Sequence, residues 1–296
     1  MSRAQLAATK EKPVSRQNKI WAVITSFNDP AALAVCVEAL VSQVDMIVVV
    51  DNKSEPEHQQ ALSALESREN FLLHRAPENL GIGAAMNIGL VAADAEGANW
   101  VLLMDQDSIA APDMIEAMLV AAARLPNAAF TPAISGIGSR REATVPFEVT
   151  YAITSGNLIP VAALRAIGGL DEGLFIDGVD FDLSLRLRRA GYRLFQVPGA
   201  HMGHSLGDAS SPGGLLGRFH TSHSPLRRYY MARNLVLNLR RHALTFPKFC
   251  GKLVIVSGLS FLSVLRFGPR RRESAAMMFR GFADGVRGKI GPYQRS

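Results

Sequence analysis

Two acids one residue apart follow an apolar run in the stretch WVLLMDQDS, residues 100–108. Asp105 and Asp107 would stand where a buried strand ends and a loop begins. Carboxylates at this spacing can hold Mg²⁺ or Mn²⁺, which favour oxygen ligands and complete their shell with water or substrate phosphates. Alternatively, Asp107 and Ser108 cap the helix that follows. The pair alone is compatible with a metal site and with a cap.

Polar groups also follow two earlier apolar runs. Thr25 and Asn28 close the run 20–27, and Asp51 closes the run 46–52. In an open α/β sheet, ligands bind at the carboxyl ends of the strands. We therefore expect these side chains to share one site with the acid pair, although Asp51 could instead serve as a helix cap or turn residue.

In the second half of the chain, the stretch VDFDLSLRL places two acids, Asp180 and Asp182, at the start of an expected helix. A carboxylate there could take a proton from an attacking hydroxyl. The alternative is that Asp180 is an N-cap and Asp182 neutralises the helix N-terminus. Two histidines follow, His201 and His204, and from the residues alone each is more often structural than part of a site.

Apolar runs of strand length alternate with helical patterns through the first 135 residues. Such alternation predicts right-handed βαβ units, a mostly parallel sheet and strands buried on both faces. The rhythm changes after residue 135, and GDASSPGG (207–214) is expected to be a loop. The expected strands are 20–27, 46–52, 71–75, 99–105, 128–135 and 193–199, the expected helices are 30–43, 55–69, 83–95, 112–124, 161–167 and 180–190, and further segments are 151–160 and 173–177.

A length of 296 residues with 48% hydrophobic residues suits one large domain with an extension. The N-terminal residues are polar, and the pattern there is neither a signal peptide nor a membrane span. Two distant cysteines form no disulfide framework, which fits a reducing compartment. The expected parts are a lead-in at 1–18, a catalytic domain at 19–217 with halves 19–108 and 109–217, and an extension at 218–296.

The extension is strongly basic. It holds 16 lysines and arginines against two acids, a net charge of +14 within a chain of net +6. The apolar segment 252–267 is shorter than the roughly 20 residues of a span, so we expect it to lie in the interface of an anionic membrane. It could instead close the domain or form a dimer interface. An oligomer is compatible with this sequence.

Several motifs together resemble the family 2 inverting glycosyltransferases, which have the GT-A fold. These are SFNDP, VVVDN, ENLGIGAAMNIGL and LLMDQDS, and the resemblance covers about residues 18–240. DQDS with NLGIGAAMN is most similar to the rhamnosyltransferase branch. The resemblance implies dTDP-L-rhamnose as donor and Mg²⁺ or Mn²⁺ as cofactor. An extension on the membrane surface would bring the site to a lipid-linked glycan, as in O-antigen-type polysaccharide synthesis. We therefore expect a cytoplasmic enzyme, peripheral on the inner membrane.

The resemblance assigns roles to individual positions. Asp180 is the catalytic base, although Val179 stands where the family often has glutamate. Asp107 is the first metal ligand, with Asp105 second and His204 near metal and diphosphate. The residues expected to bind the nucleotide sugar, from strand ends or from the resemblance, are Thr25, Asn28, Asp51, Asn79, Gly81, Asn87, Asp105, Ser155, Gly156, Arg227, Tyr230 and Arg233.

Within this last group the resemblance places Asp51 against the base and Ser155 with Gly156 beside the donor sugar. Arg227 and Arg233 belong to an Arg-x-Tyr-Tyr…Arg-Asn element, whose guanidinium groups suit a diphosphate. The other interpretation of that element is a solvated basic helix face.

The sequence raises three alternatives to a rhamnosyltransferase. The donor could be a UDP-hexose or UDP-galactofuranose. A Rossmann dehydrogenase fits poorly, since no Gly-x-Gly-x-x-Gly follows the first strand. The basic extension raises a non-enzymatic nucleic-acid-binding protein, but the chain lacks interleaved aromatic residues and any zinc or recognition-helix signature. We expect no nucleic acid partner.

Overall fold

A computed structural model describes residues 18–135, 143–204, 223–268 and 270–294. Within these ranges nine strands form one sheet in the order β3-β2-β1-β4-β8-β6-β9-β5, with β7 beside β9. The first four strands are parallel, and β8 turns antiparallel to β4. The strands are β1 Ile20–Ser26, β2 Met46–Asp51, β3 Phe71–Arg75, β4 Trp100–Asp105, β5 Ser108–Ala110, β6 Ala128–Ile134, β7 Phe147–Glu148, β8 Asn157–Pro160 and β9 Arg193–His204.

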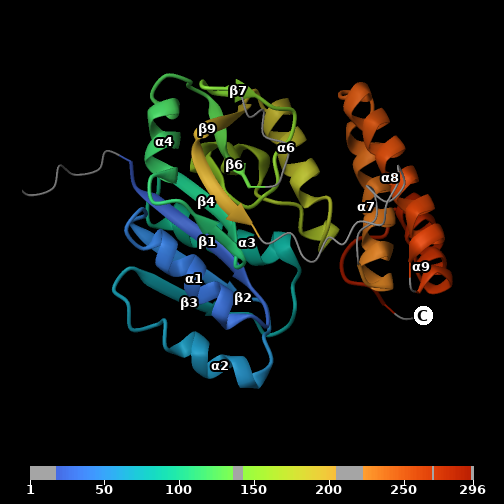
Figure 1. The fold of residues 1–296 in the computed structure, drawn as a ribbon, viewed down its shortest axis with the longest axis horizontal. Helices are drawn as coiled ribbons and strands as arrows, with labels where there is room; N and C mark the ends of the chain where they lie inside the picture. Colours follow the sequence, from blue (N-terminus) through green and yellow to red (C-terminus); the bar gives the residue numbers. More distant parts are fainter. Residues whose placement is uncertain (1–17, 136–142, 205–222, 269, 295–296) are drawn as a thin grey trace, which may run out of the picture.

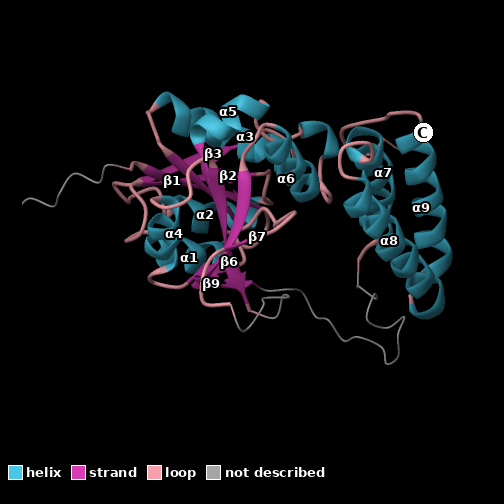
Figure 2. Cartoon of the chain, turned by 90° about the horizontal axis from the view of Figure 1, so that it is seen from above, coloured by secondary structure: helices cyan, strands magenta, loops and turns pink. Residues whose placement is uncertain are grey.

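Helices cover both faces of this sheet (Figures 1 and 2). Successive strand residues alternate between the two cores, so that Ile20 and Ala22 face one side and Trp21 and Val23 the other. The expected mixed α/β fold with a two-sided, largely parallel sheet is therefore confirmed. One face carries α1 Pro30–Leu40, α2 Pro56–Ser63 and α4 Met114–Ala122, and the other α3 Ile82–Ala95, α5 Val161–Ile167 and α6 Val179–Arg189.

Some elements differ from the predicted ones. Helix α2 ends at Ser63 rather than 69, because only Leu62 of this helix is buried and packing contributes little to its length. Strand β9 continues to His204, where it pairs with the short edge strand β5, which was not predicted. The segment 173–177, to which no element type was assigned, contains the end of a 3-10 turn, η1 (Glu172–Leu174), followed by a loop.

Three C-terminal helices lie side by side next to the α/β body (Figure 1). They are α7 Pro225–His242, α8 Pro247–Phe267 and α9 Arg271–Val286. Helices α7 and α9 approach closely because α9 has a glycine at the contact: a Cβ on Gly281 would lie 2.2 Å from the Tyr229 carbonyl oxygen. The predicted helical extension is confirmed.

Helix α8 is longer than the predicted segment 252–267. It starts at Pro247, has 21 residues and is apolar enough to cross a membrane by length and composition, with 17% of its most apolar window buried. The prediction that this segment is too short to span was therefore wrong. Its neighbours α7 and α9 carry many charged residues.

Candidate active site

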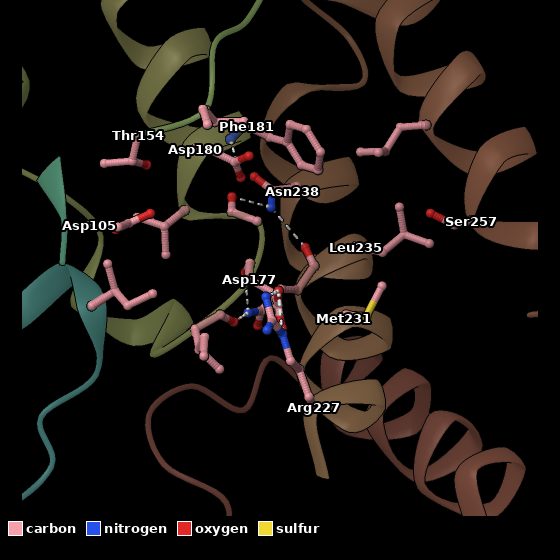
Figure 3. Close-up of a pocket in the computed structure, with 17 residues that line it drawn as sticks. Asp105, Thr154, Asp177, Asp180, Phe181, Arg227, Met231, Leu235, Asn238 and Ser257 are labelled. Carbon is pink, nitrogen blue, oxygen red and sulfur yellow. Dashed lines mark hydrogen bonds and ion pairs between the residues drawn. The ribbon is translucent and has the colours of Figure 1, made fainter. Parts of the chain in front are cut away.

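A cavity of about 340 Å³ opens at the carboxyl end of β4, between the sheet and helices α7 and α8 (Figure 3). Asp105 reaches it from β4 and Asp180 from the first turn of α6. Asp177, from the loop before α6, and Arg227, from α7, also face it. The structure thus brings together a predicted metal ligand and the predicted base, in a site with three carboxylates and one guanidinium.

Asp180 sits in surroundings that make it a stronger base than an ordinary aspartate. Burial raises its pKa to about 6, and the negative charges of Asp177 and Asp105 add to the rise. A hydrogen bond from the backbone N–H of Phe181, 3.0 Å away, acts in the opposite direction. The carboxylate is therefore ionised at neutral pH yet basic enough to accept a proton, as a general base requires.

Asp182 has a different position. It is fully buried, 2.6 Å from the Arg186 guanidinium and 3.0 Å from Nε2 of His242 on α7. Burial by itself raises the pKa of this carboxyl, but the bond to His242 and the charges of Arg186 and Arg241 hold the pKa below its usual value. Asp182 therefore links α6 to α7 and is engaged away from the cavity, which leaves Asp180 as the candidate base.

The turn that carries the two strand-end acids is held from both sides. Its middle residue, Gln106, accepts the Phe27 N–H at 2.8 Å and donates to the Phe27 carbonyl oxygen at 2.9 Å. Ser155 is fully buried, accepts the Asp105 N–H at 2.9 Å and lies 2.7 Å from the Ser108 hydroxyl. Gln106 was not predicted, and only its place between the two acids signals it. Ser155 thus holds the turn through hydrogen bonds at Asp105 and Ser108.

The donor set at this turn fits a hard divalent cation. Burial raises the pKa of the Cys36 thiol to about 12, and the charges of Asp105 and Asp107 contribute to the rise, so both carboxylates make this edge negative. His204 pairs with Ser108 in the β5–β9 ladder, next to Asp107, while its side chain lies outside the described part. Two carboxylates leave room for water and diphosphate oxygens.

Among the described residues, no cluster of three or more histidine, cysteine, aspartate or glutamate side chains is arranged around a single point. The predicted ligands Asp105 and Asp107 would therefore supply only part of an octahedral shell, and the metal site stays a prediction. His204 as a third ligand also stays a prediction.

Three other predicted residues order the loops at the ends of β1, β2 and β3. Asp51 is buried, accepts the Gln59 side-chain N–H at 3.0 Å and also accepts from Ser54. Asn28 accepts the Glu55 N–H at 2.8 Å. Asn79 accepts the Gly81 N–H at 3.0 Å and the Asn52 side-chain N–H at 3.1 Å. Their contact with a nucleotide stays a prediction.

Thr25 and Gly156, two further predicted residues at the carboxyl ends of the strands, differ in whether they have a hydrogen-bond partner. The Thr25 hydroxyl, at the end of β1 opposite Asp105, is buried and has no partner among the described residues. Gly156 packs against Pro132 and Met202, and its N–H donates to the Leu103 carbonyl oxygen at 2.8 Å. Within the described part of the chain, the Thr25 hydroxyl is therefore still able to form a hydrogen bond with a ligand.

Helix α3 holds the loop that leads to Asp180, residues 169–178, hereafter the base loop. Gly81 has a φ of +82°, and a Cβ there would lie 2.5 Å from the Phe175 carbonyl oxygen, which accepts the Ile82 N–H at 2.7 Å. Asn87 donates to the Leu170 carbonyl oxygen at 3.0 Å and accepts the Leu170 N–H at 2.8 Å. Both predicted residues thus contact the base loop, and Asn87 does not line the cavity.

Helix α7 holds the base loop from the opposite side through Asn234. Its side-chain Nδ2 lies 2.7–2.8 Å from three carbonyl oxygens of the loop, those of Leu174, Ile176 and Asp177. The loop needs such support, because Phe175 and Asp177 have φ values of +63° and +61°. A left-handed residue other than glycine costs of order 1 kcal/mol or more, and it persists where its surroundings determine it.

Arg233 and Tyr230, predicted to bind the nucleotide sugar, lie behind the base loop and do not line the cavity. The Arg233 guanidinium is 4.9 Å from the centre of the Tyr230 ring, donates to the Leu174 carbonyl oxygen at 2.9 Å and is 1% exposed. The Tyr230 hydroxyl accepts the Tyr293 N–H at 2.6 Å. A solvated basic face is therefore the wrong interpretation here, and the geometry gives this pair a supporting role.

Arg227 is the arginine of this element that does face the cavity. It forms a two-pronged ion pair with Asp177, with Nε 3.0 Å and Nη2 2.9 Å from its carboxylate oxygens. Its guanidinium lies on the same side of the cavity as Met231 and below Asp180 in Figure 3. It could meet a phosphate oxygen if a donor entered the cavity.

Comparison with known proteins agrees with this geometry. The family described as Glycosyl transferase family 2 matches residues 21–156. The dTDP-rhamnosyl transferase RfbF of Shigella flexneri is 30% identical over 245 residues, which are 76% of this chain and 81% of that protein. The N-acetylglucosaminyl-diphospho-decaprenol L-rhamnosyltransferase of Mycobacterium tuberculosis is 29% identical over 226 residues, 60% of this chain and 72% of that protein.

Among solved structures, the mannosyltransferase PcManGT from Pyrobaculum calidifontis, in complex with GDP-Man and Mn²⁺, aligns with a TM-score of 0.58. The alignment covers 92% of this chain and 87% of that one at 15% identity, so it supports the fold alone. The predicted GT-A-type fold and the predicted family are confirmed together. The chain belongs to glycosyltransferase family 2.

Proposed function

We propose that this glycosyltransferase transfers L-rhamnose from dTDP-L-rhamnose to a lipid-linked glycan during cell-surface polysaccharide synthesis. The observation that carries the proposal is the shared cavity of Asp105 and Asp180, a strand-end acid and a base of raised pKa. The similarity to a dTDP-rhamnosyl transferase supports the choice of sugar and nucleotide. The name of the mycobacterial relative supports an acceptor that is a sugar diphosphate on a lipid.

In the proposed reaction, Asp180 takes the proton of an acceptor hydroxyl. The hydroxyl oxygen forms a bond to the anomeric carbon as the bond from that carbon to the diphosphate oxygen breaks. The nucleoside diphosphate leaves with the electron pair, and the anomeric configuration inverts because attack and departure are on opposite faces. One base suffices for this displacement.

Asp107, Asp105 and His204 are the residues that would hold Mg²⁺ or Mn²⁺. The cation, when bound, would neutralise charge on the leaving diphosphate. Gln106 and Ser155 keep the two carboxylates at the turn in place. Arg227 faces the same cavity and supplies a fixed positive charge on its far side.

The basic extension is the part that we propose to meet the membrane, with the body 19–217 as the catalytic domain. Helix α8 exposes apolar side chains to solvent, and basic residues lie at both its ends. Because α7 and α9 pack beside it and are rich in charge, α8 is proposed to lie in the interface rather than span it, on the cytoplasmic face of the inner membrane. The exposed apolar residues of α8 are Val254, Ile255, Val256, Leu262 and Leu265.

Calorimetric titration with dTDP and with UDP, each with and without Mg²⁺ or Mn²⁺, tests the donor. We expect metal-enhanced binding that favours dTDP, and rhamnose transfer from dTDP-L-rhamnose to a lipid-linked acceptor. Preference for UDP would keep the enzyme class and replace the sugar by a UDP-linked one. Absence of binding to both nucleotides would contradict the proposal.

A further inference from the structure

The cavity that Asp105 and Asp180 share is hereafter the reaction cavity. We propose that a second cavity, beside the reaction cavity, binds the diphosphate end of the lipid acceptor. Lys248 and Lys252 would contact the diphosphate, and the rings of Tyr151, Phe181 and Phe249 would contact the acceptor sugar. This inference rests on the function proposed above and adds to it the place where the acceptor binds.

The second cavity has a volume of about 930 Å³ and lies between strands β6 and β9 and the start of α8. Residues 149–153 line one wall and residues 245–249 the other. It adjoins the reaction cavity, because Ile153 lines both and Phe181, next to Asp180, lines the latter. A molecule held in the second cavity could therefore present a hydroxyl to Asp180.

An aromatic cluster stands where the two cavities adjoin. The ring of Tyr151 is 5.1 Å from that of Phe181 and 5.4 Å from that of Phe249, centre to centre, and the two phenylalanine rings are 5.8 Å apart. Because Phe181 directly follows Asp180 in the chain, the cluster lies beside the base. Sugar rings present C–H faces that pack on aromatic rings, so the cluster offers a platform for an acceptor sugar.

The charge of the second cavity is opposite to that of the first. Three carboxylates line the reaction cavity, whereas the described residues lining the second include Arg188, Lys248 and Lys252 and no acid. Arg188 is already engaged with Glu148 at 2.8 Å. The two lysines have no acidic partner within the described ranges and lie four residues apart, on one face of α8. Paired ammonium groups on one face suit an anionic diphosphate.

The path of a lipid tail follows from the same helix. Beyond Lys252, α8 exposes Ile255 and Leu262 to solvent, 64% and 51% exposed. A diphosphate at the start of α8 would leave its lipid chain to run along this apolar face. The acceptor sugar would thus contact the aromatic cluster, the diphosphate would contact the two lysines, and the lipid chain would contact the apolar face of α8. The three surfaces follow one another in the same order as the three parts of the acceptor.

Calorimetry with farnesyl diphosphate tests the cavity without requiring transfer. The titration is run on the full chain with saturating dTDP and with EDTA, so that the donor diphosphate site is filled and metal is absent. We expect the wild type to bind farnesyl diphosphate and not farnesol, and the double variant Lys248→Glu, Lys252→Glu to bind it at least about tenfold more weakly. Binding of dTDP with Mg²⁺ by that variant should be unchanged.

The matched control is Arg271→Glu with Arg272→Glu, two exposed charges at the start of α9. It lowers the charge of the extension by the same amount and should leave farnesyl diphosphate binding unchanged. An equal loss in both variants would show general attraction of an anionic lipid and overturn the site, as would failure of the wild type to bind. Because no sugar transfer is measured, an inactive enzyme that still binds farnesyl diphosphate would count against the proposed function alone.

Discussion

Asp180 is a single carboxylate whose surroundings predict the pH dependence of the enzyme. Its pKa is raised to about 6 by burial and by the charges of Asp177 and Asp105. Above that pH the carboxylate is ionised and can accept a proton, whereas below that pH it is already protonated and cannot act as a base. We expect kcat/KM to fall about tenfold per pH unit below pH 6, with Asp180→Asn abolishing transfer. A pH profile of transfer that stays flat from pH 5 to 8 would contradict this assignment.

The same raised pKa predicts a gain in stability when the charge is removed. The folded state binds the Asp180 proton more tightly than the unfolded state does, so the stability gained from this proton is present below pH 4 and is lost as the pH rises through 6. At pH 8 the ionised carboxylate is a destabilising charge, and Asp180→Asn should stabilise the fold by up to about 3 kcal/mol, because the pKa is raised by about two units. Thermal unfolding at pH 8 measures it.

Asp182, two residues later, is the control for that measurement. Its pKa is lowered, because the bonds from His242 and Arg186 outweigh its burial, so the stability it contributes is present above pH 4 and is lost as the pH falls through its folded pKa. Asp182→Asn should destabilise the protein by about 3 kcal/mol at pH 8, as removal of one partner from a buried pair does. Equal shifts for the two variants would mean that Asp180 is also a structural carboxylate.

Asp107 is expected to act through a cation. Asp107→Asn should leave metal-free binding of dTDP unchanged and remove most of its enhancement by Mn²⁺ or Mg²⁺, since a carboxylate ligand is lost. Titration of dTDP with and without metal measures this. Asp113→Asn, an exposed acid at the start of α4, is the matched control and should behave as the wild type. If Asp107→Asn keeps full metal enhancement, the residue is no ligand.

At the scale of elements, the base loop is a segment held between two helices, and Asn234 of α7 contacts three of its carbonyl oxygens. Asn234→Ala should lower kcat at least about tenfold with little change in dTDP affinity. Without Asn234 the base loop should move away from α7, and Asp180 should become more solvated. Its pKa should then fall, and the acidic limb of the pH profile should shift to lower pH. Loss of packing alone would not produce that shift.

Arg240→Ala provides the comparison for Asn234→Ala. Arg240 also lies on α7, but it donates to the Val286 carbonyl oxygen on α9, at 3.0 Å, and not to the base loop. It should lower stability without moving the pH profile. The same pH shift in both variants would show that Asn234 acts only through the packing of α7.

The parallel half of the sheet could be predicted because its pattern is local. Residues 46–50 are apolar at every position, as expected of a strand that is buried on both faces. Asp105 could be placed in the site because strand ends are visible along the chain, and Asp180 because VDFDLSLRL resembles the acidic motif of the family. The base loop could not be foreseen, since its conformation at Phe175 depends on α3 and α7, which lie far away in sequence. The supporting role of Arg233 was hidden for the same reason.

Considered as a whole molecule, the protein has a negative reaction cavity in its body and an extension that combines positive charge with exposed apolar side chains. The two meet at α7, which closes the cavity and continues through α8 into the proposed membrane surface (Figures 1 and 3). This arrangement would bring a lipid-borne acceptor to the base while the donor enters from the side of the sheet ends.

The exposed face of α8 carries the last prediction. Ile255→Glu with Leu262→Glu places two charges on this face, seven residues apart on one side of the helix. Binding of the full chain to vesicles of phosphatidylcholine and phosphatidylglycerol should fall at least about tenfold, because buried apolar area in the interface is lost. Co-sedimentation with the vesicles measures it.

The control is Val91→Glu with Val120→Glu, two exposed valines on the body, which should bind as the wild type does. Carbonate extraction of wild-type membranes should release the protein, whereas a helix that crosses the bilayer would keep it in the pellet. Equal vesicle binding by the α8 variant and its control would remove α8 from the membrane contact.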